Sequence, residues 1–537
     1  MTARESSTDV LVAGAGPVGL TAACELRRRG VDCRIVDRLT EPPQYAKAVG
    51  IQPRTVEHWD AMGFAATALD AAVQMRGMIM LVNGKETMRL EMKLPPEVPF
   101  SFFALPQYET ERLLTAHLSG LGGEPERGVE LTSFEQDAEG VTAVLAGPSG
   151  EETVRTRYLV GADGAHSVVR KGLGLSFEGG AFPEEYMLGD VEVDWSIPSG
   201  MSVRSMHQTD DGVTDDVLVC IPLPGHGRYR MSMLVPPGLA APDDVPDGIE
   251  HGFVADRPAP ALADIQSVLD RLSPEPTVAR NLRWSSIFRI SHRIVDRYSD
   301  GRVFVCGDAA HIHPPTGAQG MNTGIQDAIN LAWKLTLAVR GAAAPGLLDS
   351  YDAERRPVGE EVVGRTVRHA RENFGDLGDP NNAMLREAQL LVGYPDSPIV
   401  GETGTLPGGP RPGERAPDAR GLTREGVAFP LRLFDLLRGG GHTLLVAGGS
   451  SAEVDELVDS ARERAHGGLD AYAVSDPGAQ GVARMTPTLR DTEGAFTAAY
   501  GGPGPALFLV RPDGYVGFRS NRLDGDGLLD ALARVFG

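Results

Sequence analysis

Two glycine-rich segments, far apart in the sequence, have the residue types and spacing of nucleotide chemistry. Residues 14–19 read Gly-Ala-Gly-Pro-Val-Gly, and residues 307–322 read Gly-Asp-Ala-Ala-His-Ile-His-Pro-Pro-Thr-Gly-Ala-Gln-Gly-Met-Asn. Each follows an apolar run and precedes a helical pattern, which predicts a turn between a strand and a helix. A helix N-terminus presents free N–H groups and a partial positive charge, so both turns suit an anion or the electron-rich edge of a ring.

The first turn has the spacing of a dinucleotide-binding β-α-β unit. A predicted strand, a helix and a second strand surround it, and the second strand ends at Asp37. Gly14 permits the tight turn, Gly16 lets a pyrophosphate approach the backbone, and Gly19 lets the helix pack closely. Asp37 can accept hydrogen bonds from ribose hydroxyls. A purely structural turn is the alternative, and the surrounding pattern favours dinucleotide binding.

The strand and helix patterns divide the 537 residues into α/β and β units. A Rossmann-like nucleotide-binding domain is predicted from residues 1–175 and 296–392, where strands alternate with helices. Short alternating runs over residues 176–295 predict an inserted, mostly antiparallel β-sheet domain that binds the substrate. Residues 393–421 are rich in Pro and Gly and are predicted to be a linker. Residues 422–537 have the element order of a thioredoxin-like α/β domain, without a cysteine.

Composition argues against several classes of function. The net charge of −22 repels nucleic-acid phosphates, so no nucleic-acid partner is expected. No apolar stretch is long enough to span a bilayer, so no membrane association is expected. Cys24, Cys33, Cys220 and Cys306 have neither zinc-site spacing nor a disulfide framework, which favours a cytoplasmic location.

Several polar residues allow two interpretations. His311 and His313 are of the type that binds metals, but no third ligand follows at a useful spacing, so no metal site is predicted. Arg289 precedes the second glycine-rich segment, and it either faces a substrate pocket or is a solvated arginine on an edge strand. Tyr229 and Arg230 carry the same two interpretations.

A third strand-to-turn segment ends in Asp163-Gly164, and together the three turns resemble the FAD-dependent aromatic hydroxylases, the superfamily of para-hydroxybenzoate and phenol hydroxylases. The resemblance covers residues 8–375. The cysteine-free tail is similar to that of the phenol hydroxylase branch and of bacterial hydroxylases that tailor polyketides in antibiotic biosynthesis. The resemblance implies a group A flavoprotein monooxygenase with a discontinuous FAD-binding domain.

The resemblance also assigns residues to the FAD. They are Gly14, Gly16, Val18, Gly19, Asp37, Arg38, Lys47, Gln107, Leu131, Asp163, Gly164, Asp308, Pro315, Gly317, Gly320, Met321 and Asn322. Asp37 and Arg38 would lie at the adenosine ribose, Lys47 near the diphosphate, and the residues from Pro315 onward at the isoalloxazine edge. Pro315 and Arg289 are the candidates nearest the reacting atoms. Val49 stands where phenol hydroxylases have an aspartate that assists deprotonation of the phenol.

The activity that the resemblance implies is hydroxylation of a phenolic or polycyclic aromatic substrate with NAD(P)H and O2, through a C4a-hydroperoxyflavin. The chain has no second complete G-x-G-x-x-G unit, so NAD(P)H is expected to dock transiently as a cosubstrate. The inserted sheet would form the roof of a pocket for a small aromatic or polyketide-like substrate. A homodimer is left open.

Other functions share parts of this pattern. An epoxidase or a Baeyer–Villiger oxygenase on the same scaffold would have every motif. A non-catalytic flavin-binding ligand sensor would show no substrate-stimulated oxidation of NAD(P)H. The segment Trp195-Ser196-Ile197-Pro198 matches half of the W-x-W-x-I-P signature of flavin-dependent halogenases, but Val193 replaces the first tryptophan, and we interpret the match as coincidence.

Overall fold

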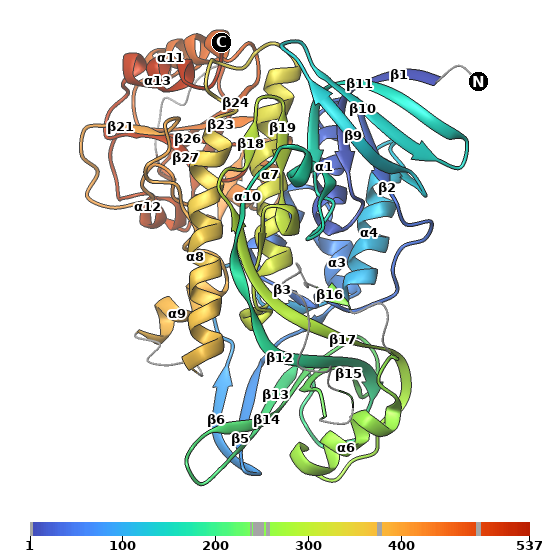
Figure 1. Ribbon diagram of the computed structural model, residues 1–537. Helices are drawn as coiled ribbons and strands as arrows, with labels where there is room; N and C mark the ends of the chain where they lie inside the picture. The colour runs from blue at the N-terminus through green and yellow to red at the C-terminus, as the bar shows by residue number, and fades with distance from the viewer. Residues whose placement is uncertain (1–3, 237–238, 240–251, 254–257, 373–378, 479–484) are drawn as a thin grey trace.

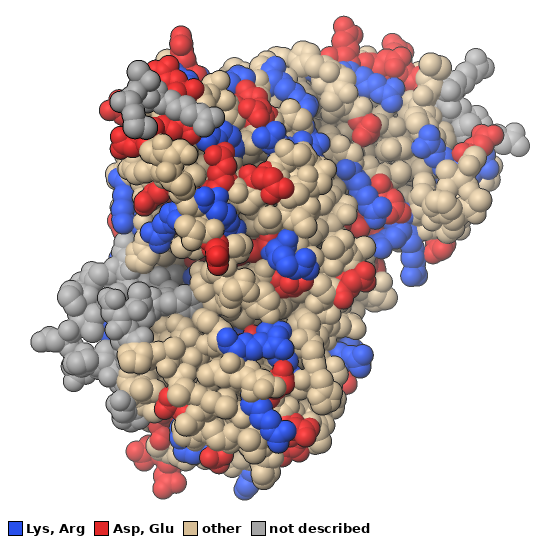
Figure 2. All heavy atoms as spheres, turned by 90° about the vertical axis from the view of Figure 1, so that its right-hand side faces the viewer, with Lys and Arg blue, Asp and Glu red and all other residues tan. Residues whose placement is uncertain are grey.

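The computed structural model describes residues 4–236, 239, 252–253, 258–372, 379–478 and 485–537. They form three large sheets and a small three-stranded one, β3 (Gly50–Ile51), β7 (Phe103–Ala104) and β4 (Val73–Gln74). Figure 1 shows the first sheet and the C-terminal sheet side by side, with the second sheet below them. Basic and acidic side chains are interspersed on the face that Figure 2 shows. Within the described residues, no helix is both long and apolar enough to cross a bilayer.

The first sheet carries the three predicted turns. Its strands are β1 (Arg4–Ala13), β2 (Cys33–Asp37), β8 (Pro125–Arg127), β9 (Glu130–Gln136), β10 (Val141–Gly147), β11 (Gly150–Gly161), β18 (Ser299–Asp300) and β19 (Val303–Val305). The order is β18-β19-β11-β1-β2-β8, and β1 pairs in parallel with β11 and β2. Gly161 lies opposite both Ala13 and Val305, so the carboxyl ends of three parallel strands meet at one edge. The turns that follow these strands are therefore neighbours.

Helices pack on this sheet and on one another. They are α1 (Pro17–Arg27), α2 (Pro53–Ala61), α3 (Ala65–Asp70), α4 (Gln107–Gly120), α5 (Val168–Gly172), α7 (Gly320–Val339) and α8 (Ser350–Glu372), with α9 (Pro380–Glu387) beyond them. Helix α1 begins with Pro17, whose fixed φ suits the first helical position. Nearly all of α7 is buried: its apolar residues pack into the core around β1, β11 and β19, and its buried charges, Asp327 and Lys334, form ion pairs with α8.

The second sheet is mixed and lies below the first. Its strands are β5 (Gly77–Val82), β6 (Lys85–Glu91), β12 (Phe177–Glu192), β13 (Met201–Gln208), β14 (Thr214–Pro222), β15 (Arg228–Leu234), β16 (Gly252–Phe253), β17 (Arg280–Val295) and β20 (His311–Ile312). The order is β16-β17-β12-β15-β14-β13-β5-β6, antiparallel except for β5 with β13. One face packs on α6 (Leu262–Leu272) through Met187, Met231 and Ile287, so side chains of opposite parity face the first sheet.

This sheet extends beyond the predicted range of 176–295. Strands β5 and β6 come from an earlier part of the chain, and β20 comes from the second glycine-rich segment. In β5, Gly77, Ile79 and Leu81 are buried and the residues between them are half-buried, which is strand periodicity. The sequence shows this alternation but not the distant strand with which it pairs.

The third sheet forms the C-terminal unit. Its strands are β21 (Gly401–Thr403), β22 (Leu422–Arg424), β23 (His442–Ala447), β24 (Leu469–Ser475), β25 (Thr488–Asp491), β26 (Ala506–Val510) and β27 (Val516–Ser520). Its helices are α10 (Leu433–Leu436), α11 (Ser451–Arg464), α12 (Ala495–Ala499) and α13 (Gly525–Ala533). The predicted strand–helix–strand unit, hairpin and closing helix are present, and the likeness to thioredoxin stays a prediction. The predicted linker also contributes structure, because β21 pairs in parallel with β27.

Candidate functional site

One cavity of about 490 Å³ joins the three turns to the second sheet. It runs from the turn between β1 and α1, past the end of β2 and the start of α4, to the segment before α7, and it ends against Leu188, Phe288 and Ile290 of the second sheet. All the residues predicted to bind the cofactor line this cavity, except Gly19, Gly317 and Asn322. Their roles as FAD ligands stay predictions, but the fold brings them to one place.

The turn between β1 and α1 has room for a phosphate group. Gly14 has a φ of +101°, and a Cβ there would lie 2.3 Å from the Ala162 carbonyl oxygen, so only glycine fits. A Cβ on Gly16 would meet nothing within 4 Å, and no side chain caps α1. The N-terminus of α1 is therefore open toward the cavity, as pyrophosphate binding requires. Gly19 lies against the turn instead, where a Cβ would be 1.9 Å from the Gly14 oxygen.

Asp37 is tied to the backbone of the first turn. Its Oδ2 accepts the Ala15 N–H at 2.7 Å, and its Oδ1 accepts the Leu39 N–H at 2.8 Å. Arg127, which sequence reasoning missed, lies 3.4 Å from Asp37 and donates to the Ala15 oxygen. Arg38 is exposed at the rim of the cavity. The carboxylate thus orders the turn and retains acceptor capacity toward the cavity.

The start of α4 contributes a second missed residue. Gln107 accepts the Ala48 N–H at 3.2 Å and donates to Glu111 Oε1 at 2.8 Å. Glu111 is 2% exposed and lines the cavity, and burial raises its pKa to about 7. Its position one helical turn after Gln107 is the sequence signal that pairs the two side chains. Leu131 of β9 is buried in the same wall.

Lys47 and Asp308 form an ion pair at the cavity wall. The two charged atoms are 3.0 Å apart, and each side chain is about one-third exposed. The turn that carries Asp308 is held from behind by Asp327 of α7, which accepts the Gly307 N–H at 3.1 Å and bonds His311 and Arg355 at 2.9 and 2.7 Å. A buried ion pair therefore positions the second glycine-rich segment.

Asp163 plays the corresponding role in the third turn. Its Oδ2 accepts the N–H groups of Val168 and Val169 at 2.7 and 3.2 Å, and Ser167, the N-cap residue of α5, accepts the Arg170 N–H at 2.9 Å. Burial raises the pKa of Asp163. Gly164 follows with a φ of +79°, a conformation that favours glycine.

Two predicted residues of the second glycine-rich segment, Gly317 and Asn322, do not line the cavity. Asn322 turns into the protein, where its Nδ2 donates to the Gly50 and Ala318 oxygens at 2.9 and 2.7 Å and its Oδ1 accepts the Gln52 N–H. The Gly317 carbonyl accepts from Gln52 at 2.7 Å. Pro315, Gly320 and Met321 do line the cavity, beside the uncapped start of α7. Asn322 thus fixes the segment in place.

The two histidines of this segment differ in surroundings. His311 bonds Asp327, whereas His313 lines the cavity and donates Nδ1–H to the Pro314 oxygen at 2.9 Å. Burial lowers the pKa of His313 to about 4, so its imidazole is neutral at pH 7. Across the described ranges, no cluster of three or more His, Cys, Asp or Glu side chains could hold a metal ion.

The second sheet closes the cavity with apolar side chains. Leu188, Phe288 and Ile290 form a buried cluster, and the Tyr186 ring lies 5.6 Å from that of Phe288. Because neighbours on a strand point to opposite faces, Arg289 points away from the cavity and pairs with Glu185 at 2.9 Å. The geometry therefore gives no support to the predicted role of Arg289 at the substrate.

Other residues that line this end were not fully recognised from the sequence. Arg230 of β15 lines the cavity, whereas Tyr229 beside it belongs to the core under α6. Val49, which stands where an aspartate was expected, is buried in the cavity wall. This end is thus aromatic and aliphatic with one cation, a lining typical of a pocket for a flat organic molecule.

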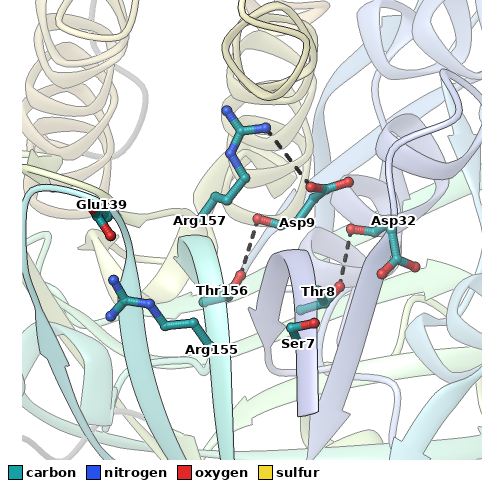
Figure 3. Close-up of a pocket in the computed structure, with 8 residues that line it drawn as sticks. All are labelled: Ser7, Thr8, Asp9, Asp32, Glu139, Arg155, Thr156 and Arg157. Carbon is teal, nitrogen blue, oxygen red and sulfur yellow. Dashed lines mark hydrogen bonds and ion pairs between the residues drawn. The ribbon is translucent and has the colours of Figure 1, made fainter.

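A second depression of about 400 Å³ lies at the opposite end of the first sheet (Figure 3). Its polar groups are bonded to one another: Thr156 donates to the Asp9 oxygen at 3.1 Å, Thr8 to the Asp32 oxygen at 3.2 Å, and Arg157 lies 4.0 Å from Asp9. No predicted site residue lines it. It lies at the amino ends of the strands, away from the edge where open α/β sheets bind ligands.

Comparison with known proteins places the site in a family. Residues 7–366 match the family model described as FAD binding domain, and residues 409–537 match the one described as aromatic-ring hydroxylase, C-terminal. The chain is 33% identical over 98% of its length to a flavin-dependent monooxygenase of Mycobacteroides abscessus, covering 99% of that protein. It is 34% identical, over 98% of its length and 99% of the relative's, to 12-dehydrotetracycline 5-monooxygenase/anhydrotetracycline 6-monooxygenase of Streptomyces rimosus.

A solved structure agrees with these relatives. Aklavinone-11 hydroxylase in a ternary complex with FAD and aklavinone matches 98% of both chains with a TM-score of 0.76 and 27% identity.

Proposed function

The chain belongs to the family of FAD-dependent aromatic-ring monooxygenases, and from that premise we propose that it hydroxylates a polycyclic phenol with NAD(P)H and O2. The observation that carries the proposal is the single cavity that joins three nucleotide-type turns to an aromatic and aliphatic pocket. A cofactor and a flat substrate can meet there without leaving the protein.

The residues around the cavity fit an extended FAD. The open helix start at Gly16 would hold the pyrophosphate, Asp37 and Arg127 the ribose side, and Lys47 and Asp308 the middle of the molecule. The uncapped start of α7 would lie at the edge of the ring system. When bound, FAD would accept a hydride from NAD(P)H and activate O2.

For this chemistry the protein stabilises negative charge, excludes water from the cavity and holds the aromatic ring in place. The free N–H groups at the start of α7 stabilise negative charge near Met321. Leu188, Phe288 and Ile290 exclude water from the end of the cavity, which protects a reactive oxygen species from loss. The same side chains hold the plane of an aromatic ring in place.

The substrate class is supported by the relatives. The Streptomyces rimosus relative is named as a monooxygenase of 12-dehydrotetracycline and anhydrotetracycline, and the solved neighbour holds aklavinone. We infer a polycyclic aromatic substrate of polyketide type. The four buried, free cysteines support a reducing, cytoplasmic location. A homodimer stays a prediction.

Reconstitution with FAD tests the proposal. The purified protein is loaded with FAD, and the oxidation of NADH and NADPH is followed with and without anhydrotetracycline, aklavinone and 1-hydroxy-2-naphthoate. We expect at least one of these to accelerate oxidation several-fold, with NMR locating one new hydroxyl on the ring. A protein that takes up no FAD, or that oxidises NAD(P)H at the same rate with every aromatic compound, would refute the proposal.

A further inference from the structure

Arg230 is a buried cation at the substrate end of the cavity. It lies on β15, beside β12 in the second sheet (Figure 1), and it is 6% exposed. Its neighbours Tyr229 and Met231 point into the core under α6, so Arg230 points toward the cavity that it lines. Leu188, Phe288 and Ile290 line the same end.

The carboxylate nearest in register is already engaged. Asp190 of β12 lies opposite Arg230, but both of its oxygens accept from Arg228, at 2.8 Å from Nε and by a second bond from Nη2. Arg228 also donates to the Tyr108 hydroxyl at 2.7 Å. Glu192, the next carboxylate on this face of β12, lies opposite Arg228 and accepts from Asn281 and Arg283. Neither Asp190 nor Glu192 therefore accepts a hydrogen bond from Arg230.

No described residue accepts a hydrogen bond from Arg230, and its buried Nε has no partner. The other buried arginines of the described chain all donate to a carboxylate or a carbonyl: Arg29, Arg54, Arg170, Arg228, Arg355, Arg365, Arg511 and Arg519. Burial lowers the pKa of Arg230 to about 10, which leaves the guanidinium charged at neutral pH.

A buried cation without a counter-ion destabilises the free protein, and a ligand anion relieves that cost. The planar guanidinium group can donate two parallel N–H bonds to a carboxylate, or two N–H bonds to one ionised oxygen. The ammonium group of a lysine does not offer this fixed geometry. A nearby cation also favours the ionised form of a phenol, so no carboxylate base is required at the position of Val49.

We propose that Arg230 binds an ionised oxygen on the aromatic substrate, so that the pocket selects compounds that carry a phenolate, an enolate or a carboxylate beside the ring. This inference rests on the proposed function, because it identifies Arg230 as the residue that determines substrate specificity in the same cavity. The apolar cluster of Leu188, Phe288 and Ile290 contacts the ring, and the guanidinium orients it.

Two matched probe pairs test this by calorimetric titration of the FAD-loaded protein at pH 7.5. 1-Hydroxy-2-naphthoate against its methyl ester tests a carboxylate, and 2,4-dinitro-1-naphtholate against its methyl ether tests a phenolate. The unsubstituted protein is expected to bind the anion of at least one pair about tenfold or more tightly than its neutral partner, a difference of about 1.4 kcal/mol. Equal affinity within both pairs would overturn the proposal.

Three variants identify the responsible side chain. R230M is expected to abolish the preference for the anion, and R230K to retain part of it, because a charge remains without the fork. R283M is the control, since Arg283 is on the same sheet in an exposed pair with Glu192, and it should leave the preference unchanged. A preference that survives in R230M would contradict the assignment.

The melting temperature of R230M without probe separates a binding role from a structural one. Because the substitution removes an unpaired buried charge, the holoprotein should melt at the same or a higher temperature. A clear fall in melting temperature would show a structural role for the guanidinium and would overturn the proposal. Binding is measured without turnover, so this result is independent of whether NAD(P)H oxidation is stimulated.

Discussion

At the scale of single residues, the two glycines at the start of α1 have separable roles. Gly14 meets the Ala162 oxygen and adopts a conformation that favours glycine, whereas Gly16 has an ordinary extended conformation and faces open space. Gly14 is thus required by the protein itself. Gly16 is required only if a ligand occupies the space in front of it.

This difference predicts opposite results for two substitutions. Gly16→Val should leave the melting temperature of the FAD-free protein unchanged and weaken FAD binding at least about tenfold, ~1.4 kcal/mol. Gly14→Ala should destabilise the FAD-free protein by about 1–3 kcal/mol through strain and contact. Thermal melts and fluorescence titration with FAD measure both. If Gly16→Val binds FAD as tightly as the unsubstituted protein, the pyrophosphate does not bind at this turn.

The residues of the turns could be predicted from the sequence because their geometry is local. Gly14, Asp163 and Asp308 each follow a strand within a few positions, and parallel pairing brings the strand ends together. The side-chain contacts of Asn322 could not be predicted, because its partners, Gly50 and Gln52, lie far away in the sequence. The sequence motif does not reveal that the amide holds two segments together.

At the scale of elements, the second sheet was the hardest part to predict. Arg289 on β17 and Arg230 on β15 are both arginines on strands that pair with β12, and the direction of each side chain decides which of them faces the cavity. On β17, Phe288 and Ile290 face the cavity, so Arg289 between them faces the opposite side of the sheet. The register of β15 and β17 depends on their pairing with β12, which single-sequence patterns do not specify.

Helix α7 positions the second glycine-rich segment through Asp327. Asp327→Asn should destabilise the protein by about 3–5 kcal/mol, because it leaves the buried Arg355 guanidinium without its carboxylate. It should also weaken FAD binding, since the Gly307 N–H loses a charged acceptor. Chemical denaturation with and without FAD measures both effects. Glu360→Gln, in an exposed pair with Arg356 on α8, is the control. If Asp327→Asn unfolds like the unsubstituted protein, the turn is held by other contacts.

At the scale of the whole molecule, buried charges join the C-terminal unit to the helices of the FAD-binding part. Arg511 donates to Glu354 of α8 at 2.6 and 2.9 Å, and Lys334 of α7 donates to the same carboxylate at 2.8 Å. Trp333 of α7 packs into the C-terminal core, with its ring 5.3 Å from that of His442. The C-terminal unit is therefore part of one folded body and packs directly against α7.

His442 should make this interface sensitive to acid. Burial lowers its pKa to about 3, so between pH 6.5 and 3 the folded protein binds fewer protons than the unfolded chain, and stability falls as the pH falls. At pH 5 the loss is about 2 kcal/mol. His442→Phe should therefore raise the melting temperature at pH 5 relative to the unsubstituted protein and change it little at pH 8. An equal shift at both pH values would exclude titration of this histidine as the cause.

We propose that this chain uses bound FAD to insert one oxygen atom of O2 into an aromatic ring. The most direct measurement is mass spectrometry of the product after turnover under ¹⁸O2, with FAD-loaded protein, NADPH or NADH, and anhydrotetracycline, aklavinone or 1-hydroxy-2-naphthoate. We expect a product that carries one ¹⁸O and forms only when FAD and the nicotinamide are both present. Oxygen that comes from water, or FAD-loaded protein that leaves all three compounds unchanged, would contradict it.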